Sequence, residues 1–391
     1  MDEVPAGPAS PEPRRLSLSV VIPVYNGGRD FEDCLRRLRD SDATDFEIVV
    51  VDDGSTDGSG ALAESLGARV VRHERPLGPA AARNLGAKLA HAPLVFFVDA
   101  DVAVHRDTLS RILARFEADP DLSALFGSYD DTPTAPDLVS QYRNLLHHYV
   151  HQQGDFNDDA RPARTFWTGC GAIRTQDFLD HGGFDPELYT RPAIEDIELG
   201  YRITRAGGRI VLARDVLGTH MKRWSLKSVV MTDIFQRGVP WLLLMKRSHI
   251  QETDLNVKPG QKLCVVAAGL LVLSLPVAPL QPWAFATVPA ALGAIMALNR
   301  DFYRFLARRR GWPFAIAAVP LHFAYYCCCG VSVVIAEALW RFPGLSRETS
   351  GQRASVSLRK DAAVGASIPP PAAATGTSAE RVRRPSRWTK R

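Results

Sequence analysis

Cysteine is scarce in this sequence of 391 residues, which has six, and their spacing does not form a disulfide framework. They lie at positions 34, 170, 264 and 327–329. This usage is typical of a reducing compartment. The N-terminal residues lack the apolar stretch of a secretory signal. Residues 1–15 are rich in proline, and the basic tail 346–391 consists largely of Ser, Ala, Pro, Arg and Lys with almost no aromatics, so we expect both to be disordered.

Motifs of several ligand-binding classes are also absent. No helix-turn-helix, zinc-finger or RNA-binding pattern occurs, and a net charge of +4 does not by itself indicate a nucleic acid. We therefore expect no nucleic-acid partner. Neither a P-loop nor a G-x-G-x-x-G loop follows the first expected strand, which argues against both kinds of phosphate-binding site.

Charged residues are missing from two long stretches, 263–299 and 311–336. Each could hold a membrane crossing of roughly 20 residues, and the first could hold two short crossings broken near Pro279 and Pro282. A buried soluble helix of this length usually keeps a polar face, so an apolar soluble core is the weaker alternative. We predict a membrane region of about three helices over 262–340.

The first hundred residues contain short apolar runs separated by amphipathic stretches and turn residues. Strands are expected at 16–22, 46–51, 69–72 and 94–98, and helices at 31–38, 61–66 and 79–90. Pro23 is expected to end the first strand. Strands that alternate with helices of this length indicate βαβ units and a parallel sheet, which places the domain in the α/β class.

Carboxylates follow two of these strands. Asp52 and Asp53 end the second strand, and Asp99 and Asp101 form an Asp-x-Asp motif after the last one. Parallel strands share their carboxyl edge, where ligands of open α/β sheets bind, and paired carboxylates suit Mg²⁺ or Mn²⁺ shared with substrate phosphates. The alternative for the last pair is simple capping of the helix near 107–108.

Four segments in this order resemble the motifs of family 2 glycosyltransferases of the GT-A fold: SVVIPVYNGG, IVVVDDGSTDGS, GPAAARNLGAKLA and VFFVDADV. The resemblance covers roughly residues 17–224. It implies a nucleotide-diphospho-sugar transferase fold over 16–224, with a mostly parallel sheet flanked by helices. Position by position, it assigns the nucleobase pocket to Pro23, Val24 and Tyr25, the base contact to Asp53, the nucleotide side to Arg83, the ribose to Asp99, and the metal-diphosphate to Asp99 and Asp101, with Asp101 the direct ligand.

The resemblance extends to the second half of the domain. The segment FWTGCGAI, with Gly169 and Cys170, is similar to the one that lies under the donor sugar. Glu195-Asp196 is similar to the motif whose carboxylate acts as general base, and it implies Asp196 as the base with Glu195 as its neighbour. Such a base on the acceptor hydroxyl implies direct displacement with inversion. The alternative for both acids is stabilisation of the helix that they open.

The segment HMKRW resembles the Q-x-x-R-W motif of membrane-bound family 2 synthases, with His220 at the glutamine position. That resemblance places Trp224 at the acceptor and Arg223 and His220 at the diphosphate. A basic, aromatic membrane-interface segment is the alternative.

Three histidines at 147, 148 and 151 lack the spacing of a metal motif, so we expect a partly exposed helix there. Aromatic and basic residues are interspersed over 222–250, which suits an amphipathic helix at an anionic leaflet, and we expect 225–261 to be an interface segment. The arginine-rich stretch 300–310 is expected on the cytoplasmic side, with the catalytic domain. A third crossing would then put the basic tail outside, against the same rule, unless the segment around Pro320 is bent or re-entrant.

These features together predict an inverting glycosyltransferase of the inner (cytoplasmic) membrane. It would use Mg²⁺ or Mn²⁺ and a nucleotide-sugar donor, expected to be a UDP-sugar, and would glycosylate a hydroxyl of a lipid-linked or membrane-proximal acceptor. A polyprenyl-phosphate glycosyltransferase is one alternative. A catalytically inactive nucleotide-binding membrane scaffold is another.

Overall fold

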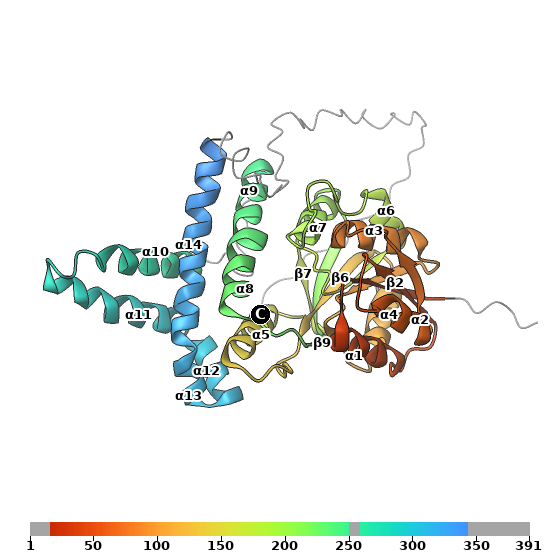
Figure 1. Cartoon of the computed structure of the whole chain (residues 1–391), viewed down its shortest axis with the longest axis horizontal. Helices are drawn as coiled ribbons and strands as arrows, with labels where there is room; N and C mark the ends of the chain where they lie inside the picture. Colours follow the sequence, from red (N-terminus) through yellow and green to blue (C-terminus); the bar gives the residue numbers. More distant parts are fainter. Residues whose placement is uncertain (1–15, 250–258, 343–391) are drawn as a thin grey trace, which may run out of the picture. The chain divides into compact units, whose positions relative to one another are not determined.

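The computed structural model of the chain describes residues 16–249 and 259–342 (Figure 1). The two segments predicted to be disordered, 1–15 and 346–391, lie outside the described residues. So do residues 250–258 of the predicted interface segment.

Strands and helices alternate through the first part of the chain, as the apolar pattern predicts. The elements are β1 (Leu18–Val24), α1 (Gly28–Arg39), β2 (Phe46–Asp52), α2 (Ser59–Ser65), β3 (Arg69–Arg72), α3 (Pro79–Leu89), β4 (Leu94–Val98), β5 (Val102–Val104), α4 (Thr108–Ala118), β6 (Leu122–Tyr129) and α5 (Leu138–His151). The prediction for Pro23 is wrong, because β1 continues to Val24 and Pro23 lies opposite Val51. Since β4 pairs with β1 only as far as Val21, the missing N–H of Pro23 leaves no bond to β4 unmade.

The remaining elements of the α/β domain (residues 16–224) include a second set of strands. They are β7 (Ala160–Ala163), β8 (Cys170–Arg174), α6 (Thr175–Asp180), α7 (Glu195–Arg205) and β9 (Arg209–His220). All nine described strands form one sheet in the order β3-β2-β1-β4-β8-β6-β9-β5, with β7 paired to β9.

The sheet is mixed, whereas the sequence predicts a mostly parallel one. The neighbours β3, β2, β1 and β4 are parallel, but β8 runs antiparallel between β4 and β6. The antiparallel register sets Cys170 opposite Val98. The segment before β8 therefore meets the carboxyl end of β4, where the Asp-x-Asp motif begins.

Two apolar layers hold helices against the sheet, one on each face. Adjacent side chains of a strand point to opposite faces, and Phe96 and Phe97 of β4 show this directly. Phe96 belongs to the layer under α1, α2 and α4, and Phe97 to the layer under α3, α6 and α7. The helices flanking the sheet confirm the α/β class expected from the sequence (Figure 1).

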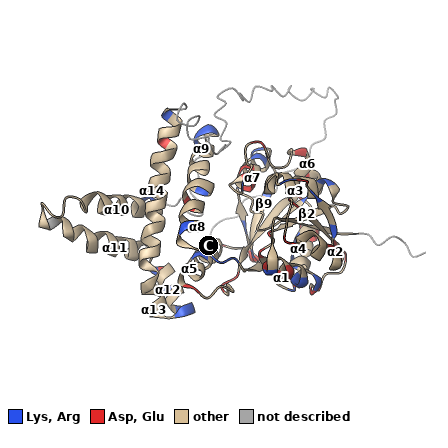
Figure 2. Cartoon of the chain, in the orientation of Figure 1, with Lys and Arg blue, Asp and Glu red and all other residues tan. Residues whose placement is uncertain are grey.

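Helices are the only regular elements of the described chain after residue 224. They are α8 (Leu226–Met231), the π-helix η1 (Thr232–Gly238), α9 (Val239–Arg247), α10 (Pro259–Ser274), the 3₁₀ turn η3 (Pro282–Ala286), α11 (Thr287–Leu298), α12 (Arg300–Arg310), α13 (Trp312–Ala317) and α14 (Val319–Arg341). Among the described residues, Trp312–Arg341 alone is long and apolar enough to cross a membrane, and α10 and residues 284–298 are shorter apolar helices. One such helix is weak support for a membrane span. Figure 2 shows α10 and α11 almost free of charged residues.

Candidate functional site

The turn after β1 presents an aromatic ring at the carboxyl edge of the sheet. Val24 is buried, but the side chain of Tyr25 is 56% exposed. The following residue, Asn26, has φ 51° and accepts a hydrogen bond from the Thr56 N–H at 2.8 Å. The Gly27 N–H donates to Ser59 Oγ at 3.1 Å. These bonds fix the turn, so Tyr25 offers an exposed ring on rigid backbone.

Asp53 lies beside this turn, but its carboxylate is used by the chain itself. Oδ1 accepts from the Leu77 N–H at 2.9 Å and lies 2.7 Å from His73 Nδ1, and Oδ2 accepts from the Gly78 N–H at 2.8 Å. Gly78 has φ 94°, and a Cβ there would collide with the Thr190 carbonyl. The Asp53 carboxylate therefore shapes the loop before α3. A nucleobase could hydrogen-bond to it only through an oxygen that already accepts a hydrogen bond from the chain.

Arg83 joins the two acidic motifs. From α3, its buried guanidinium donates to Asp99 Oδ1 at 2.6 Å and to Glu195 Oε1 at 2.8 Å. Glu195 Oε2 also accepts from the Ala193 N–H at 2.9 Å. The carboxylates after β4 and at the start of α7 are therefore held on one cation, as the sequence prediction of a shared site requires.

Asp101 faces His220, which is the last residue of β9. The distance from His220 Nε2 to Asp101 Oδ2 is 3.6 Å, and the Met221 N–H donates to the Asp101 carbonyl at 2.9 Å. His220 Nδ1 lies 2.6 Å from Asn144 Oδ1 on α5, and the imidazole stacks on Tyr129 at 4.1 Å between ring centroids. With Nδ1–H donating to Asn144, Nε2 faces Asp101: it donates to the carboxylate when the imidazole is protonated and offers a lone pair when it is neutral.

The environment of Asp101 favours its ionised form. Burial acts to raise the pKa of this carboxyl, but attraction and hydrogen bonding from His220, with a further contribution from Lys222, lower it to about 2. The Lys222 ammonium stands 4.7 Å from the centre of the Trp224 ring. Lys222 and Arg223 are both exposed, and Arg223 pairs with Asp137 at 3.4 Å. Lys222, which the sequence prediction did not include, is thus the residue of this pair that acts on Asp101, after His220.

The segment before β8 brings backbone close to this edge. A Cβ at Gly169 would collide with the Trp167 ring, and one at Gly171 with the Trp167 carbonyl. The Cys170 side chain is fully buried, and burial raises the pKa of its thiol to about 12. Cys170 is therefore a packing residue of β8 and does not carry a reactive thiolate.

Asp196 is held by this same segment. Its Oδ2 accepts from the Thr168 N–H at 3.0 Å and from Thr168 Oγ1 at 3.1 Å, and its Oδ1 accepts from the Ile197 N–H at 2.8 Å. Burial raises the pKa of Asp196, and the Thr168 N–H opposes that rise. A carboxylate with a raised pKa, oriented by fixed donors, is what a general base at neutral pH requires.

A divalent cation fits the Asp101 corner only if the substrate completes its coordination. Among the described residues, no three His, Cys, Asp or Glu side chains gather as a metal site. Asp101 is 29% exposed, and His220 Nε2 and the second Asp99 oxygen lie on the same edge. One or two carboxylates plus diphosphate oxygens are the usual ligands of Mg²⁺ in such enzymes.

The histidines of α5 do not join the acidic cluster. His151 is buried and His147 and His148 are half-buried, and their rings pack with Trp167, Tyr129 and Phe305. Burial lowers the pKa of His151 to about 4, and it lowers that of His147 well below the usual range. These two imidazoles are neutral packing groups near the site.

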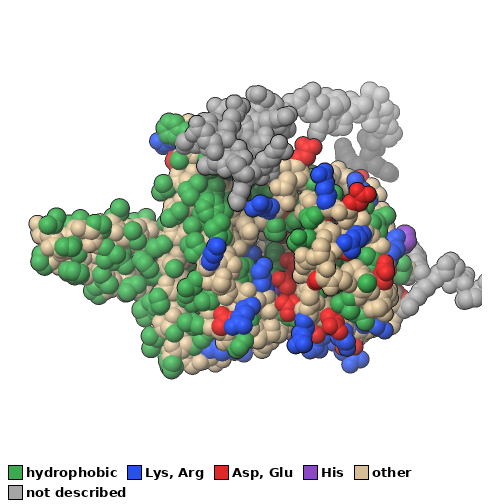
Figure 3. Space-filling view, in the orientation of Figure 1, with side chains coloured by type: hydrophobic (Ala, Val, Ile, Leu, Met, Phe, Trp, Pro, Cys, Tyr) green, Lys and Arg blue, Asp and Glu red, His purple; other side chains and the backbone are tan. Residues whose placement is uncertain are grey.

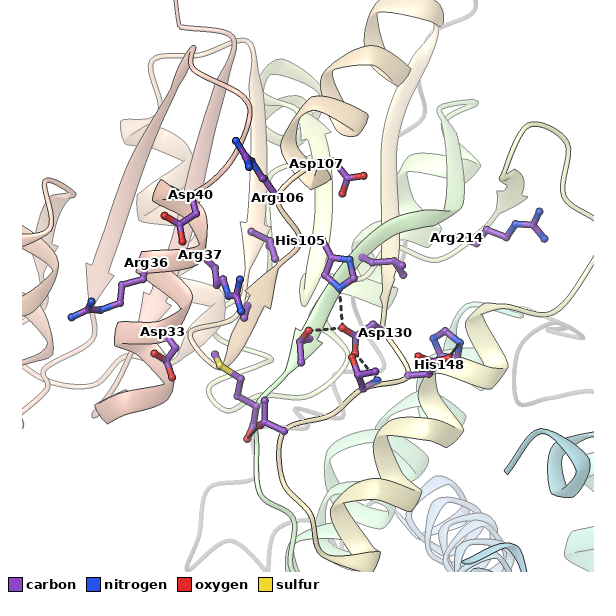
Figure 4. Close-up of a pocket in the computed structure, with 18 of the residues that line it drawn as sticks. Asp33, Arg36, Arg37, Asp40, His105, Arg106, Asp107, Asp130, His148 and Arg214 are labelled. Atoms are coloured by element: carbon purple, nitrogen blue, oxygen red, sulfur yellow. Dashed lines mark hydrogen bonds and ion pairs between the residues drawn. The ribbon is translucent and has the colours of Figure 1, made fainter. Parts of the chain in front are cut away.

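A separate pocket lies outside the acidic cluster. Its volume is about 1130 Å³, and it is bounded by α1, β5, the end of β6 and β9 (Figure 4). One of its histidines, His105, binds Asp130 at 2.8 Å, and one of its arginines, Arg309, binds Asp131 at 2.7 Å. None of the site residues predicted from the sequence lines it. We place the site at the acidic cluster because the carboxylates there meet on shared partners.

Sequence reasoning missed several residues of the cluster. They are Tyr129, Asn144, Thr168, Lys222 and Arg237, the last on η1 with a guanidinium that interacts electrostatically with Tyr129 and Asp196. Local sequence gives no signal for Tyr129, Asn144 and Arg237, because each acts through a partner distant in the chain. Thr168 and Lys222 had a local clue, since they lie within the FWTGCGAI and HMKRW segments.

Comparison with known proteins identifies the domain. Residues 19–181 match the family described as glycosyl transferase family 2. A validoxylamine A glucosyltransferase of Streptomyces hygroscopicus subsp. jinggangensis is 34% identical over 230 residues, which cover 51% of this chain and 54% of that protein. A pre-mycofactocin glycosyltransferase of Mycobacterium tuberculosis is 28% identical over 245 residues, covering 61% and 50%. The chain spans about half the length of these curated relatives.

Solved structures with a similar course include a mannosyltransferase of Pyrobaculum calidifontis in complex with GDP-Man and Mn²⁺. Its TM-score is 0.49 at 19% identity, over 81% of this chain and 86% of that one. Another is TarS 1–349 of S. aureus with UDP-GlcNAc, with a TM-score of 0.45 at 19% identity over 84% and 92%. The family model places the matched residues 19–181, which lie within the α/β domain and carry the four motifs noted above, in glycosyl transferase family 2.

Proposed function

We propose that this protein is an inverting, divalent-metal-dependent glycosyltransferase. It moves a sugar from a nucleotide-diphosphate donor, in the first instance a UDP-sugar, to a hydroxyl of a lipid-linked or membrane-proximal acceptor. The observation that supports this most directly is the convergence of Asp99, Asp101, Glu195 and Asp196 at the carboxyl edge of β4, bridged by Arg83 and faced by His220.

The nucleotide half of the donor lies, in this proposal, against the turn after β1. Tyr25 is the exposed ring that stacks on the base, and Pro23 and Val24 shape the turn below it. Stacking on an aromatic ring does not discriminate between nucleobases, so hydrogen bonds must supply the preference for one nucleotide. Asp53 supplies such a bond only if a base replaces His73 at its Oδ1.

The diphosphate lies over Asp101, with Lys222 and Arg83 as the nearby cations. A bound Mg²⁺ or Mn²⁺ supplies positive charge that stabilises the departing diphosphate. Asp101 and His220 Nε2 would hold it, with the second oxygen of Asp99 adjacent. Asn144 keeps His220 in the tautomer that leaves Nε2 free to act as a ligand.

Asp196 is the general base. The acceptor oxygen forms a bond to the anomeric carbon while its proton passes to Asp196, and the bond to the diphosphate breaks with both electrons leaving on oxygen. This single displacement inverts the anomeric carbon. Thr168 orients the base, and Glu195, bound to Arg83 and the Ala193 N–H, positions the start of α7 rather than touching the acceptor.

Acceptor choice is open between two kinds of molecule. The apolar helices after residue 259 support an acceptor at a membrane. The names of two relatives give validoxylamine A and pre-mycofactocin, and neither name mentions a lipid. We favour the membrane-proximal acceptor, because the helical region packs directly on the domain through η1 and α9.

A donor screen tests the proposal. Membranes containing the full-length protein are incubated with Mn²⁺ and a panel of UDP-, GDP- and TDP-sugars, and both the lipid extract and the aqueous phase are analysed by mass spectrometry. We expect one sugar to be transferred in a reaction that chelation abolishes and that the Asp101→Asn variant does not support. Transfer or donor hydrolysis unaffected by chelation, or by both Asp101→Asn and Asp196→Asn, would contradict the proposed mechanism. A sugar product in the aqueous phase alone would show that the acceptor is soluble.

A further inference from the structure

The segment formed by η1 and α9 is attached to the α/β domain at both ends. Asp233 of η1 forms a buried ion pair with Arg143 of α5. Trp241 Nε1 donates to the Tyr201 hydroxyl of α7 at 3.1 Å, and Arg205 donates to the Ser248 carbonyl after α9. The predicted interface helix is thus part of the domain's surface along its described length.

Helix α14 runs along the other side of η1 and α9. Buried apolar side chains join them in one cluster: Ile234, Val239 and Leu243 against Cys328 and Ala336. The helices are in close contact at Gly238, where a Cβ would collide with Ser332 Oγ. Near the carboxyl end of α14, Glu337 pairs with Lys246 of α9 at 2.7 Å. The far end of the long apolar helix is therefore tied to the domain through α9.

The other end of the same helical stretch is tied to the domain as well. Residues of α12, α13 and the start of α14 form a buried cluster with α5, which includes Tyr142, Leu145, Phe302, Leu306 and Ala318. Charged contacts surround it, because Arg309 pairs with Asp131 at 2.7 Å and Arg310 donates to Gln141 at 2.8 Å.

These attachments are incompatible with a crossing by residues 312–341. A crossing would place one end of the stretch beyond the far leaflet, and the charged residues bound along it would have to lie in hydrocarbon. The buried pair Arg143–Asp233 is such a contact, and ionised side chains are costly there. A crossing would also carry the Lys246–Glu337 pair to the far leaflet, although α9 is attached to the α/β domain. A position along the membrane surface avoids that cost.

The hairpin of α10 and α11 has the opposite character. Its arms are antiparallel, because Ser274 contacts Thr287 at the outer end at 2.6 Å and Asn299 donates to Cys264 at the base at 3.3 Å. Leu273 and Leu280 are 74% and 80% exposed, and no charge occurs from residue 263 to 299. Figure 3 shows hydrophobic side chains over this hairpin. An apolar surface of this extent needs an apolar partner.

The hairpin is too short for a double crossing. The 16 residues of α10 and the 15 of the apolar helix 284–298 give arms of about 24 Å and about 22 Å, against a hydrocarbon core of about 30 Å. Its base carries the exposed cations Lys262, Arg300 and Arg304. At the base, the Tyr326 hydroxyl of α14 donates to Gln261 at 2.6 Å and to Asn299 at 3.0 Å. The hairpin therefore leaves α14 at a ring of polar and basic groups, as expected at a headgroup layer.

We propose that the protein is monotopic: the hairpin 263–298 enters the bilayer from the side of the α/β domain and returns, while 312–341 lies along the membrane surface without crossing it. Acyl chains surround the hairpin, and anionic headgroups meet the cations at its base. The inference rests on the membrane association in the proposed function and not on the transfer reaction. It also keeps the arginine-rich stretch 300–310 and the end of α14 on the same side of the membrane. The conflict between a third crossing and the positive-inside rule then does not arise.

Cysteine labelling in sealed vesicles tests this topology. In the full-length chain with its six native cysteines replaced, single cysteines are introduced by Asp121→Cys in the α/β domain, Trp312→Cys, Arg341→Cys and Leu280→Cys. All four positions are exposed. A membrane-impermeant maleimide is added to vesicles of each orientation. We expect Trp312→Cys and Arg341→Cys to label from the same face as Asp121→Cys, and Leu280→Cys to label from neither face before detergent is added.

Other outcomes overturn the proposal. Labelling of Arg341→Cys from the face opposite Asp121→Cys would show that α14 crosses, and opposite-face labelling of Leu280→Cys would show that the hairpin crosses. Chain recovered in the soluble fraction, as a monomer or with the hairpin buried in a dimer, would end this inference and the membrane association together. Donor turnover measured on the same preparations shows separately whether the glycosyltransferase assignment stands.

Vesicle binding gives a second test. Leu273→Glu is expected to lower binding to phosphatidylcholine vesicles more than tenfold, whereas the matched control Leu179→Glu, an exposed leucine of α6, leaves it unchanged. Arg300→Gln and Arg304→Gln are each expected to lower binding about fivefold when phosphatidylglycerol is present and not when it is absent. Equal binding by Leu273→Glu and the native chain would overturn the role of the hairpin.

Discussion

Arg83 donates to Glu195 at 2.8 Å across 112 positions of the chain. Its other nitrogen donates to Asp99, so one buried cation fixes α3, α7 and the end of β4 to each other. A buried charge that loses its partner is costly, so this contact stabilises the arrangement of the site as well as the fold.

Replacement of Arg83 should therefore destabilise the protein. We expect Arg83→Met to lower the free energy of unfolding by about 3–5 kcal/mol, because Glu195 and Asp99 are left near each other without a cation. Thermal unfolding of the detergent-solubilised chain measures it. The matched control is Arg36→Met on α1, whose pair with Glu32 is exposed to solvent and should contribute little to stability. Equal shifts in the two variants would show that the Arg83 bridge is not a stabilising contact.

Asp101 should control metal-dependent donor binding. We expect Asp101→Asn to reduce turnover by about 10²-fold or more and to abolish the increase in melting temperature that UDP with Mn²⁺ produces. Asp107→Asn, at the N-terminus of α4 and outside the cluster, is the control and should behave as the native protein. Retention of the Mn²⁺-dependent shift in Asp101→Asn would remove this residue from the metal site.

Asp196 should set the acidic side of the pH profile. The base must be ionised, and burial raises the pKa of Asp196, so kcat should fall with decreasing pH at values above the usual range of aspartate. Thr168→Val removes the hydroxyl that favours the ionised form and keeps the N–H, so the acidic limb should move to higher pH. Asp196→Asn should bind donor normally but lose turnover. An unchanged limb in Thr168→Val would contradict Asp196 as the base.

Lys222 and Arg223 offer a direct comparison of neighbouring cations. Lys222 acts on Asp101, whereas Arg223 extends to Asp137 on the outside. We expect Lys222→Gln to raise the KM for the donor at least about tenfold, because a charged contact to the diphosphate is lost, and Arg223→Gln to leave it nearly unchanged. The reverse result would mean that Arg223 turns inward when donor binds, as the resemblance of the HMKRW segment implies.

Cys170 should be dispensable for chemistry. Its thiol is fully buried with a pKa of about 12, so it carries almost no thiolate at neutral pH. Cys170→Ala should keep kcat within about threefold, and no covalent sugar adduct should be seen by mass spectrometry of the intact protein. A covalent sugar adduct found in the native protein and absent from Cys170→Ala would show that the reaction is a double displacement and not a single inverting one.

The apolar runs and turn residues by themselves determined the first half of the fold. The end of β4 at Val98, the helix that begins at Pro79 and the acidic motif after β4 follow from side chains adjacent in sequence, because strand and helix periodicity are local properties. The ordered motifs likewise indicated the family, since each lies at the end of one predicted strand or at the start of one helix.

Tertiary structure alone decided how the site is completed and how the apolar helices are arranged. The antiparallel entry of β8, which sets Cys170 opposite Val98, the contact of Asn144 with His220 and the proximity of Lys222 to Asp101 depend on partners far away in the chain. The same holds for α14, whose apolar composition permits a crossing while its contacts with α5 and α9 hold it at the domain. Composition fixes which surfaces avoid water, but only the packing of distant segments decides which of them remain to meet a bilayer.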